Sequence, residues 1–351
     1  MASTNTRFTA LGMSGCGKTC YVLGMYYQMI TGYKGFSLKA DGDSVSKLET
    51  WMDQLDDGNG QERFPAGTGL TEVSDYQFKL KYALKDIMTF NWIDYAGGTL
   101  RARENNPESY QALTESIEQS TVLYLFLDGE LFCEDDPAVG IRNLKKNVRT
   151  LNAYLNEYTE SHPDTVPPIV FVITKGDLVS DYWSNYNITQ IMHECFDMLM
   201  CKDIRFYVTM VSLGEGIAED NYSGDVEPIG MHLPFFIGIY HQFLNFCLSL
   251  KREIEDEERR NRGSIAVNQS QINQINNRGW LGRLLNGSDI SGQLRAIESA
   301  QETIRSNSEL LMHYKKLMQA VSSQLLRDSR QITMYEDGIE REFDAAEIVN
   351  L

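Results

Sequence analysis

Basic residues are scarce in this sequence relative to acidic ones. Its 351 residues include 32 Lys and Arg against 49 Asp and Glu, which gives a formal net charge of −17 at neutral pH. Proteins that bind the backbone of a nucleic acid do so largely through Lys and Arg side chains that displace counterions. The excess of acids therefore argues against a nucleic-acid partner and favours a small molecule or another protein.

Cysteine is also scarce, with six residues in the chain. They form no CxxC pair and stand near no His at the spacing of a zinc site, which argues against a disulfide framework and against a structural metal. The first residues lack the apolar stretch of a secretion signal. We therefore expect a protein of the reducing cytoplasm.

Long apolar stretches without charge are rare, and residues 231–250 (MHLPFFIGIYHQFLNFCLSL) stand out. Their length matches a membrane-spanning helix. However, His241, Gln242 and Asn245 fall on one side at helical spacing, and a bilayer would leave these groups unsatisfied. With 42% hydrophobic residues, the chain can bury a large core of its own. We expect a half-buried helix with Pro234 in its first turn, and no transmembrane segment.

The stretch GMSGCGKT at residues 12–19 matches the pattern of a phosphate-binding loop. A strand-like stretch (8–11) precedes it and an apolar, helix-like stretch (20–30) follows. In such a loop the backbone N–H groups surround a phosphate at the N-terminus of a helix. Lys18 would reach the β- and γ-phosphates and act in catalysis, and the Thr19 hydroxyl would bind Mg²⁺. The residues predicted to contact the nucleotide here are Ser14, Gly15, Cys16, Gly17, Lys18, Thr19 and Cys20.

A second stretch, WIDYAGG, supports the first. Asp94 ends an apolar run (88–93), as expected of a strand whose carboxylate meets Mg²⁺ at the edge of a sheet. Gly97 offers an N–H group to the γ-phosphate. Alone, an Asp followed by Gly is also a common turn. Placed after a phosphate loop, the pair predicts that Asp94 is a metal residue and Gly97 a catalytic one.

The run IVFVI (169–173) has the β-branched character of a buried parallel strand, and Thr174, Lys175 and Asp177 follow it. Asp177 would accept the ring N–H and the amino proton of guanine, a donor pair that adenine lacks, and Lys175 would lie along the base. The alternative is a surface turn. A further strand (205–211) ends at Ser212 and Leu213, which we expect to contact the same base.

Together these motifs resemble the TRAFAC class of P-loop GTPases, which contains the small Ras-like proteins, over roughly residues 7–250. Thr174 stands where the NKxD motif of that class has Asn. A predicted antiparallel hairpin (75–82 and 88–93) favours this class. The FPAGT stretch and the helical tail are most similar to a bacterial double-GTPase-like group associated with defence and conflict operons.

The resemblance implies a three-layer α/β/α sandwich of the P-loop NTPase type. Its sheet would be mostly parallel with one antiparallel edge strand, as in small GTPases, and a helical extension would follow at the C-terminus. The bound nucleotide would be GTP or GDP, with Mg²⁺ as the cofactor.

The resemblance also implies a Thr in the first switch that closes over Mg²⁺ and the γ-phosphate. Thr68, in FPAGTG, is our first choice as this catalytic and metal residue, and Thr71 is the second. Both precede the hairpin. An inserted helix (44–55) lengthens this part of the chain, so FPAGTG read simply as a flexible loop remains an alternative.

Gly98 is the main departure from the Ras-like pattern, in which a Gln at this position orients the attacking water. Hydrolysis should therefore be slow unless Arg101, Arg103 or Glu104 acts in cis, or a partner protein donates an Arg or Gln. Gly15 stands where cation-activated GTPases carry Asn, so potassium assistance is not supported.

We expect a GTPase domain over residues 1–260, a polar linker over 261–292 with an apolar patch at 280–285 (WLGRLL), and a helical segment over 293–351. A coiled coil that joins two copies, or a helix packed on its own domain or a partner, would explain the sevenfold repeat. Its members are Ile297, Ile304, Leu311, Met318, Leu325, Ile332, Ile339 and Ala346.

The leading hypothesis is a switch that binds GTP, hydrolyses it slowly and controls a protein partner. The resemblance to the bacterial double-GTPase-like group implies a role in bacterial defence. The alternatives are a pseudo-GTPase scaffold that holds nucleotide without efficient turnover, and a self-assembling mechanochemical GTPase.

Overall fold

The structure is a computed structural model. It divides into two compact units, one comprising Met1–His241 with Gln324–Phe343 and the other Gln242–Ser323 with Asp344–Leu351. For residues 261–276, 287–294 and 296–297 the structure describes the backbone but not the side chains. The residues described are 6–65, 73–99, 107–163, 166–179, 182, 184, 186–200, 204–220, 222, 224–276 and 287–343.

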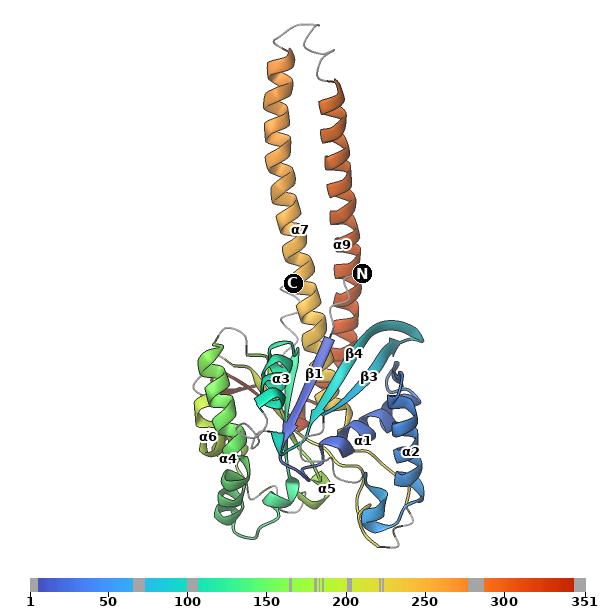
Figure 1. Ribbon diagram of the computed structural model, residues 1–351, viewed down its shortest axis with the longest axis vertical. Helices are drawn as coiled ribbons and strands as arrows, with labels where there is room; N and C mark the ends of the chain where they lie inside the picture. Colours follow the sequence, from blue (N-terminus) through green and yellow to red (C-terminus); the bar gives the residue numbers. More distant parts are fainter. Residues whose placement is uncertain are drawn as a thin grey trace. The chain divides into compact units, whose positions relative to one another are not determined.

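The first unit contains a mixed sheet, which has nine strands in the described part of the chain (Figure 1). Five neighbouring strands run parallel, in the order β4-β1-β5-β6-β7, and the four outer pairings are antiparallel. In spatial order the strands are β2 (Phe36–Ala40), β3 (Val73–Tyr82), β4 (Lys85–Tyr95), β1 (Thr6–Gly12), β5 (Val122–Leu127), β6 (Ile169–Ile173), β7 (Phe206–Met210), β8 (Ile332–Glu336) and β9 (Ile339–Arg341).

The predicted α/β class is confirmed, but the prediction of one antiparallel edge strand is wrong. The predicted hairpin is present as β3 and β4, joined by a two-residue turn at Ala83 and Leu84, whose φ angles are 47° and 66°. Strand β3 is not an edge, because β2 pairs with it on its other side. At the opposite end β8 and β9 extend the sheet beyond β7.

Strands β8 and β9 also overturn the prediction of helix to the end of the chain. From Ile332 to Glu336 the burial pattern fits a strand better than a sevenfold helical repeat, since Ile332 and Met334 are buried and Thr333 is less so. Asp337 and Gly338 form the turn with φ angles of 54° and 69°. An Asp-Gly pair between apolar alternations is a strong hairpin signal, and here it outweighs the repeat.

Helices flank the sheet of the first unit. The predicted helices at 20–30 and 44–55 are confirmed as α1 and α2, each extended by two residues. The helices are α1 (Lys18–Ile30), α2 (Ser44–Asp57), α3 (Pro107–Glu118), α4 (Pro137–Ser161), α5 (Gly176–Val179) and α6 (Ile188–Met200), with short 3-10 turns η1 (Gly60–Arg63), η3 (Gly129–Phe132) and η5 (Ser329–Gln331).

Alternate residues of the central strands pack on opposite sides. On one side Leu123 and Phe171 join a core shared with helices α3, α4 and α6. On the other side Trp92 and Phe126 lie 5.3 Å from the ring of Tyr21 in α1. Because both faces are covered, β5 and β6 are buried along their whole length. The carboxyl ends of the parallel strands therefore meet at one edge.

The second unit is built from most of α7 (His232–Asn276) and α9 (Gly287–Arg327), which lie side by side (Figure 1). Tyr314 packs its ring 6.0 Å from that of Phe243 and 4.8 Å from that of Phe246. The expected linker at 261–292 is instead helical over 261–276 and from 287 onward. The patch at 280–285 lies outside the described residues.

One helix in the described chain, His232–Arg260, is long and apolar enough to cross a membrane, yet 67% of its most apolar window is buried inside the protein. Phe235 and Phe236 are fully buried, and the His241 ring hydrogen-bonds the Tyr207 hydroxyl at 2.9 Å. Pro234 lies in the first turn, as predicted. This is the pattern of a core helix in a soluble protein.

Candidate functional site

The phosphate-loop sequence connects the end of β1 to the start of α1. Gly17 caps α1 with a φ of 82°, a conformation that residues with a Cβ rarely adopt. No side chain caps this helix end and its first turn holds no acidic residue. The positive end of the helix dipole and its N–H groups are thus well suited to an anion. Ser14 and Gly15 are exposed at this point.

Lys18 lies beneath the loop with 7% of its surface exposed. Its Nζ donates to the carbonyl oxygens of Gly12 and Met13, both at 3.2 Å. These bonds hold the loop in a closed curve. They also keep a cation directly beside the backbone that would surround a phosphate.

Thr19 and Asp94 meet behind the loop. The Thr19 hydroxyl donates to Asp94 Oδ2 at 2.8 Å, and Asp94 is 1% exposed. Burial raises the pKa of Asp94, against the opposing effects of Lys18 and of this hydrogen bond. The other oxygen, Oδ1, has no hydrogen-bond partner within the described structure. A buried, unsatisfied carboxylate oxygen beside a hydroxyl is the kind of hard oxygen ligand that Mg²⁺ takes, so the pair fits the predicted ion.

Gly97 lies against the same loop. A Cβ at this position would come 2.1 Å from the backbone nitrogen of Ser14 and 2.4 Å from the carbonyl carbon of Met13. No larger residue fits without moving the loop. The backbone of Gly97 is therefore held next to the position predicted for the phosphates.

At the other end of the site, Thr174 donates its hydroxyl to the Cys16 carbonyl at 3.0 Å and to the Leu127 carbonyl at 3.2 Å. Thr174 thus ties the loop after β6 to the phosphate loop. Asp177 accepts a hydrogen bond of 2.6 Å from the Ser212 hydroxyl, and this hydroxyl also accepts one from the Gly214 N–H at 3.1 Å. The Asp177 carboxylate is therefore oriented by the loop after β7.

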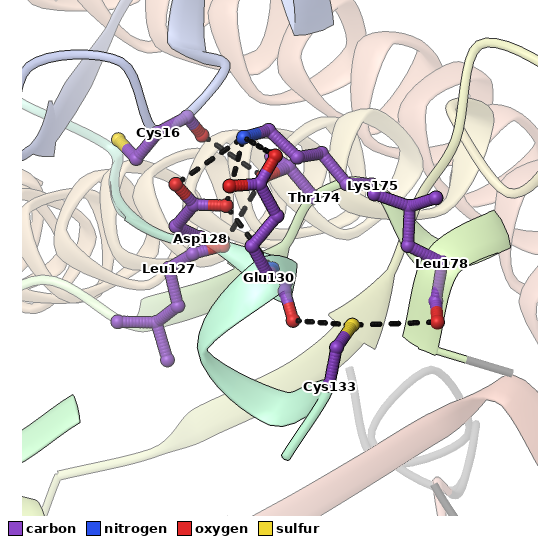
Figure 2. Close-up of polar contacts among 9 residues, drawn as sticks. Cys16, Leu127, Asp128, Glu130, Cys133, Thr174, Lys175 and Leu178 are labelled. Carbon is purple, nitrogen blue, oxygen red and sulfur yellow. Dashed lines mark hydrogen bonds and ion pairs between the residues drawn. The ribbon is translucent and has the colours of Figure 1, made fainter. Parts of the chain in front are cut away.

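Lys175 has a φ of 53° and points its Nζ between two carboxylates, 3.1 Å from Asp128 and 2.8 Å from Glu130 (Figure 2). Burial alone would lower the pKa of Lys175, but the hydrogen bonds to Glu130 and Asp128 outweigh it, and the pKa is raised. The sequence alone did not predict Asp128 and Glu130 as partners of Lys175. The position of Asp128 could have indicated a role in the site, because Asp128 follows a buried strand just as Asp94 ends one.

One cavity of about 600 Å³ connects these two ends. It is lined by most of the residues that the sequence predicted for the nucleotide: Ser14, Gly15, Gly17, Lys18, Thr19, Cys20, Gly97, Thr174, Lys175, Asp177, Ser212 and Leu213.

Two predicted residues stand behind the lining of this cavity. Cys16 is buried and contributes its carbonyl to Thr174, and Asp94 contacts Thr19. Thr68 and its alternative Thr71 lie outside the described residues, as do Arg101, Arg103 and Glu104.

Further parts of the cavity wall were not predicted. Gln61, Phe64 and Pro65 line it on one side, and residues 215–219 of the loop after β7 line it on another. Of the first wall, only Phe64 and Pro65 belong to a stretch that the sequence had singled out, FPAGT. Nothing in the composition of the second marked it as part of a site.

The cysteines beside the phosphate loop are not activated. Burial raises the pKa of both the Cys16 and the Cys20 thiols to about 11. Each thiol therefore stays protonated near neutral pH and is a poor nucleophile. This leaves Lys18, Thr19, Asp94 and the backbone as the chemical groups of this end of the site.

No protein-family model matches the chain, and no curated protein matches its sequence.

Proposed function

We propose that this chain binds a guanine nucleotide with Mg²⁺ in the described cavity, hydrolyses GTP slowly, and acts as a switch on a protein partner. The observation that carries the proposal is the pairing of two chemistries in one cavity. Lys18 and Thr19 lie at one end, and the Asp177 and Ser212 pair lies at the other.

The phosphate end offers cations and N–H donors. Lys18 would exchange its carbonyl partners, Gly12 and Met13, for phosphate oxygens. Thr19 and Asp94 would hold Mg²⁺, which when bound neutralises charge on the phosphates. Gly97 can bring its backbone N–H close because it has no side chain.

The base end offers a fixed acceptor. The Ser212 hydroxyl orients the Asp177 carboxylate, so that its oxygens can accept the adjacent N–H donors of guanine. Adenine presents a ring acceptor where guanine presents a donor, and a carboxylate repels it. The carboxylate should therefore select guanine in two ways, by binding its N–H donors and by repelling the ring nitrogen of adenine.

The strand order gives further support. Within the nine strands, β3-β4-β1-β5-β6-β7 with an antiparallel β3 is the order expected for a small-GTPase-like P-loop fold. On this proposal β2 and the β8–β9 hairpin are additions to that fold. The same proposal includes membership of the TRAFAC class and a relationship to the bacterial double-GTPase-like group. It also includes a role in defence and a cytoplasmic location.

Slow turnover follows from Gly98, which has no side chain with which to orient water. A partner that inserts an Arg or Gln into the site would supply the missing group. The same glycine favours the second candidate function, a scaffold that holds nucleotide without efficient turnover. A self-assembling role draws less support, because Met318 and Leu325 of the sevenfold repeat are already buried within the chain.

The decisive experiment is to measure binding of GTP, GDP and ATP to the purified protein in Mg²⁺, together with multiple-turnover phosphate release. GTP binding with no ATP binding supports the proposal. Equal binding of ATP, or no binding, refutes it. Phosphate release that disappears in Thr19→Ala excludes the scaffold alternative.

A further inference from the structure

Two walls of the cavity come from segments far apart in the sequence. One is the turn η1 and the residues after it, which contribute Gln61, Phe64 and Pro65, and the other is the loop after β7, which contributes residues 215–219. Both lie in the first unit. Contacts between residues outside the cavity lining also join these two segments.

Arg63 makes the main connection. It is 4% exposed, and its guanidinium donates to the Leu55 carbonyl and to the Tyr222 carbonyl, both at 2.9 Å. The same guanidinium lies 5.3 Å from the centre of the Tyr222 ring. One buried cation therefore links helix α2 and turn η1 to the loop after β7.

The neighbouring contacts show that the two walls fit closely. A Cβ on Gly60, whose φ is 51°, would lie 2.4 Å from Asp220 Oδ1. Gln54 of α2 donates its side-chain amide to the Phe64 carbonyl at 3.0 Å. Phe64 and Pro65 are thus held from α2 while Arg63, one residue earlier, holds the opposite wall.

We propose that Arg63 is a positioning residue that fastens these two walls together and so sets the time a nucleotide stays in the cavity. The inference rests on the proposed function, because it takes a guanine nucleotide as the occupant. A ligand leaves when the walls part, and parting them breaks the bond to Tyr222 and exposes a buried cation. Removing the guanidinium lowers that barrier.

The test is the dissociation rate of a fluorescent GDP analogue, chased with excess unlabelled GDP. Arg63→Ala should raise the rate by roughly 10- to 100-fold, the range expected when a charge-assisted hydrogen bond is lost. Arg63→Lys should give an intermediate rate, since one ammonium cannot reproduce the fork that reaches both carbonyls. This milder variant decides the matter if the alanine variant fails to fold.

Tyr222→Phe is the matched control. The Tyr222 hydroxyl donates to the Asp225 carbonyl at 3.2 Å, whereas Arg63 uses the Tyr222 ring and backbone carbonyl, which the control keeps. Its dissociation rate should equal that of the wild type. An unchanged rate in a folded Arg63 variant, or an equal rise in the control, overturns the inference and leaves guanine binding intact. A wild-type protein that holds no guanine nucleotide overturns both.

Discussion

Replacing Asp177 with Asn should change which purine the cavity binds. The Ser212 hydroxyl donates to Asp177 Oδ1 at 2.6 Å, and an amide can accept that bond only through its oxygen. The bond therefore fixes the orientation of the new side chain. The NH₂ group takes the place of the second carboxylate oxygen and faces the base with donors instead of an acceptor.

The magnitude follows from the bonds that are lost. A hydrogen bond to a charged group contributes about 1.5–3 kcal/mol, and guanine would lose the one made to the replaced oxygen, so the affinity for GTP should fall at least roughly 10- to 100-fold. Xanthine carries a carbonyl where guanine carries its amino group, and this carbonyl can accept from the new NH₂. The affinity for XTP should rise as that for GTP falls.

Competition titrations with a fluorescent nucleotide in Mg²⁺ measure both affinities. Asp225→Asn removes the same charge from an exposed position outside the lining of the cavity and should leave both unchanged. If Asp177→Asn binds GTP as well as the wild type does, Asp177 does not read the base and the proposed orientation of the nucleotide is wrong.

Three further predictions concern other parts of the first unit. Lys18→Ala should abolish nucleotide binding in calorimetry while the thermal melt stays cooperative, and retained micromolar binding would contradict the role given to the loop. Gly97→Ala should lower the affinity for GTP at least about tenfold, because its Cβ would overlap Ser14; an unchanged titration would show that Gly97 is not held against the loop. Burial lowers the pKa of His241 from 6.5 to about 3, so between these pH values the unfolded chain binds a proton that the folded protein does not. The free energy of unfolding should therefore fall as the pH drops from 6.5 toward 3, by about 1.4 kcal/mol per pH unit from this residue. Urea titrations between pH 7 and 4 should show a shallower pH dependence in His241→Gln, and equal slopes would refute this assignment.

Several elements of the first unit were predictable because their signals are local. The phosphate loop joins a strand and a helix within twenty residues, and the run at Ile169–Ile173 is a strand with those bounds. Asp177 and Ser212 each follow a buried parallel strand. Since such strands end at one edge of the sheet, their approach to Lys18 could be anticipated from order alone.

The remaining features depend on contacts that sequence order does not specify. Strand β2 forms because Phe36 pairs with Tyr82, some forty-five residues away, and β8 forms because Tyr335 pairs with Phe206. The partners of Lys175, Asp128 and Glu130, and the Tyr222 partner of Arg63 lie in connecting segments whose composition suggests only exposure. The length of α7 was underestimated because the polar residues at 264–276 favour a linker by composition, whereas the helix continues to Asn276.

The late position of β8 in the chain has a consequence for synthesis on the ribosome. Strand β7 is made more than one hundred residues before its outer neighbour, and the intervening chain forms the long helices. Until Ile332–Glu336 emerges, the outer edge of β7 presents a row of N–H and C=O groups that are not paired with another strand. Nascent or prematurely terminated chains therefore expose an aggregation-prone strand edge, which β8 covers once it has been made.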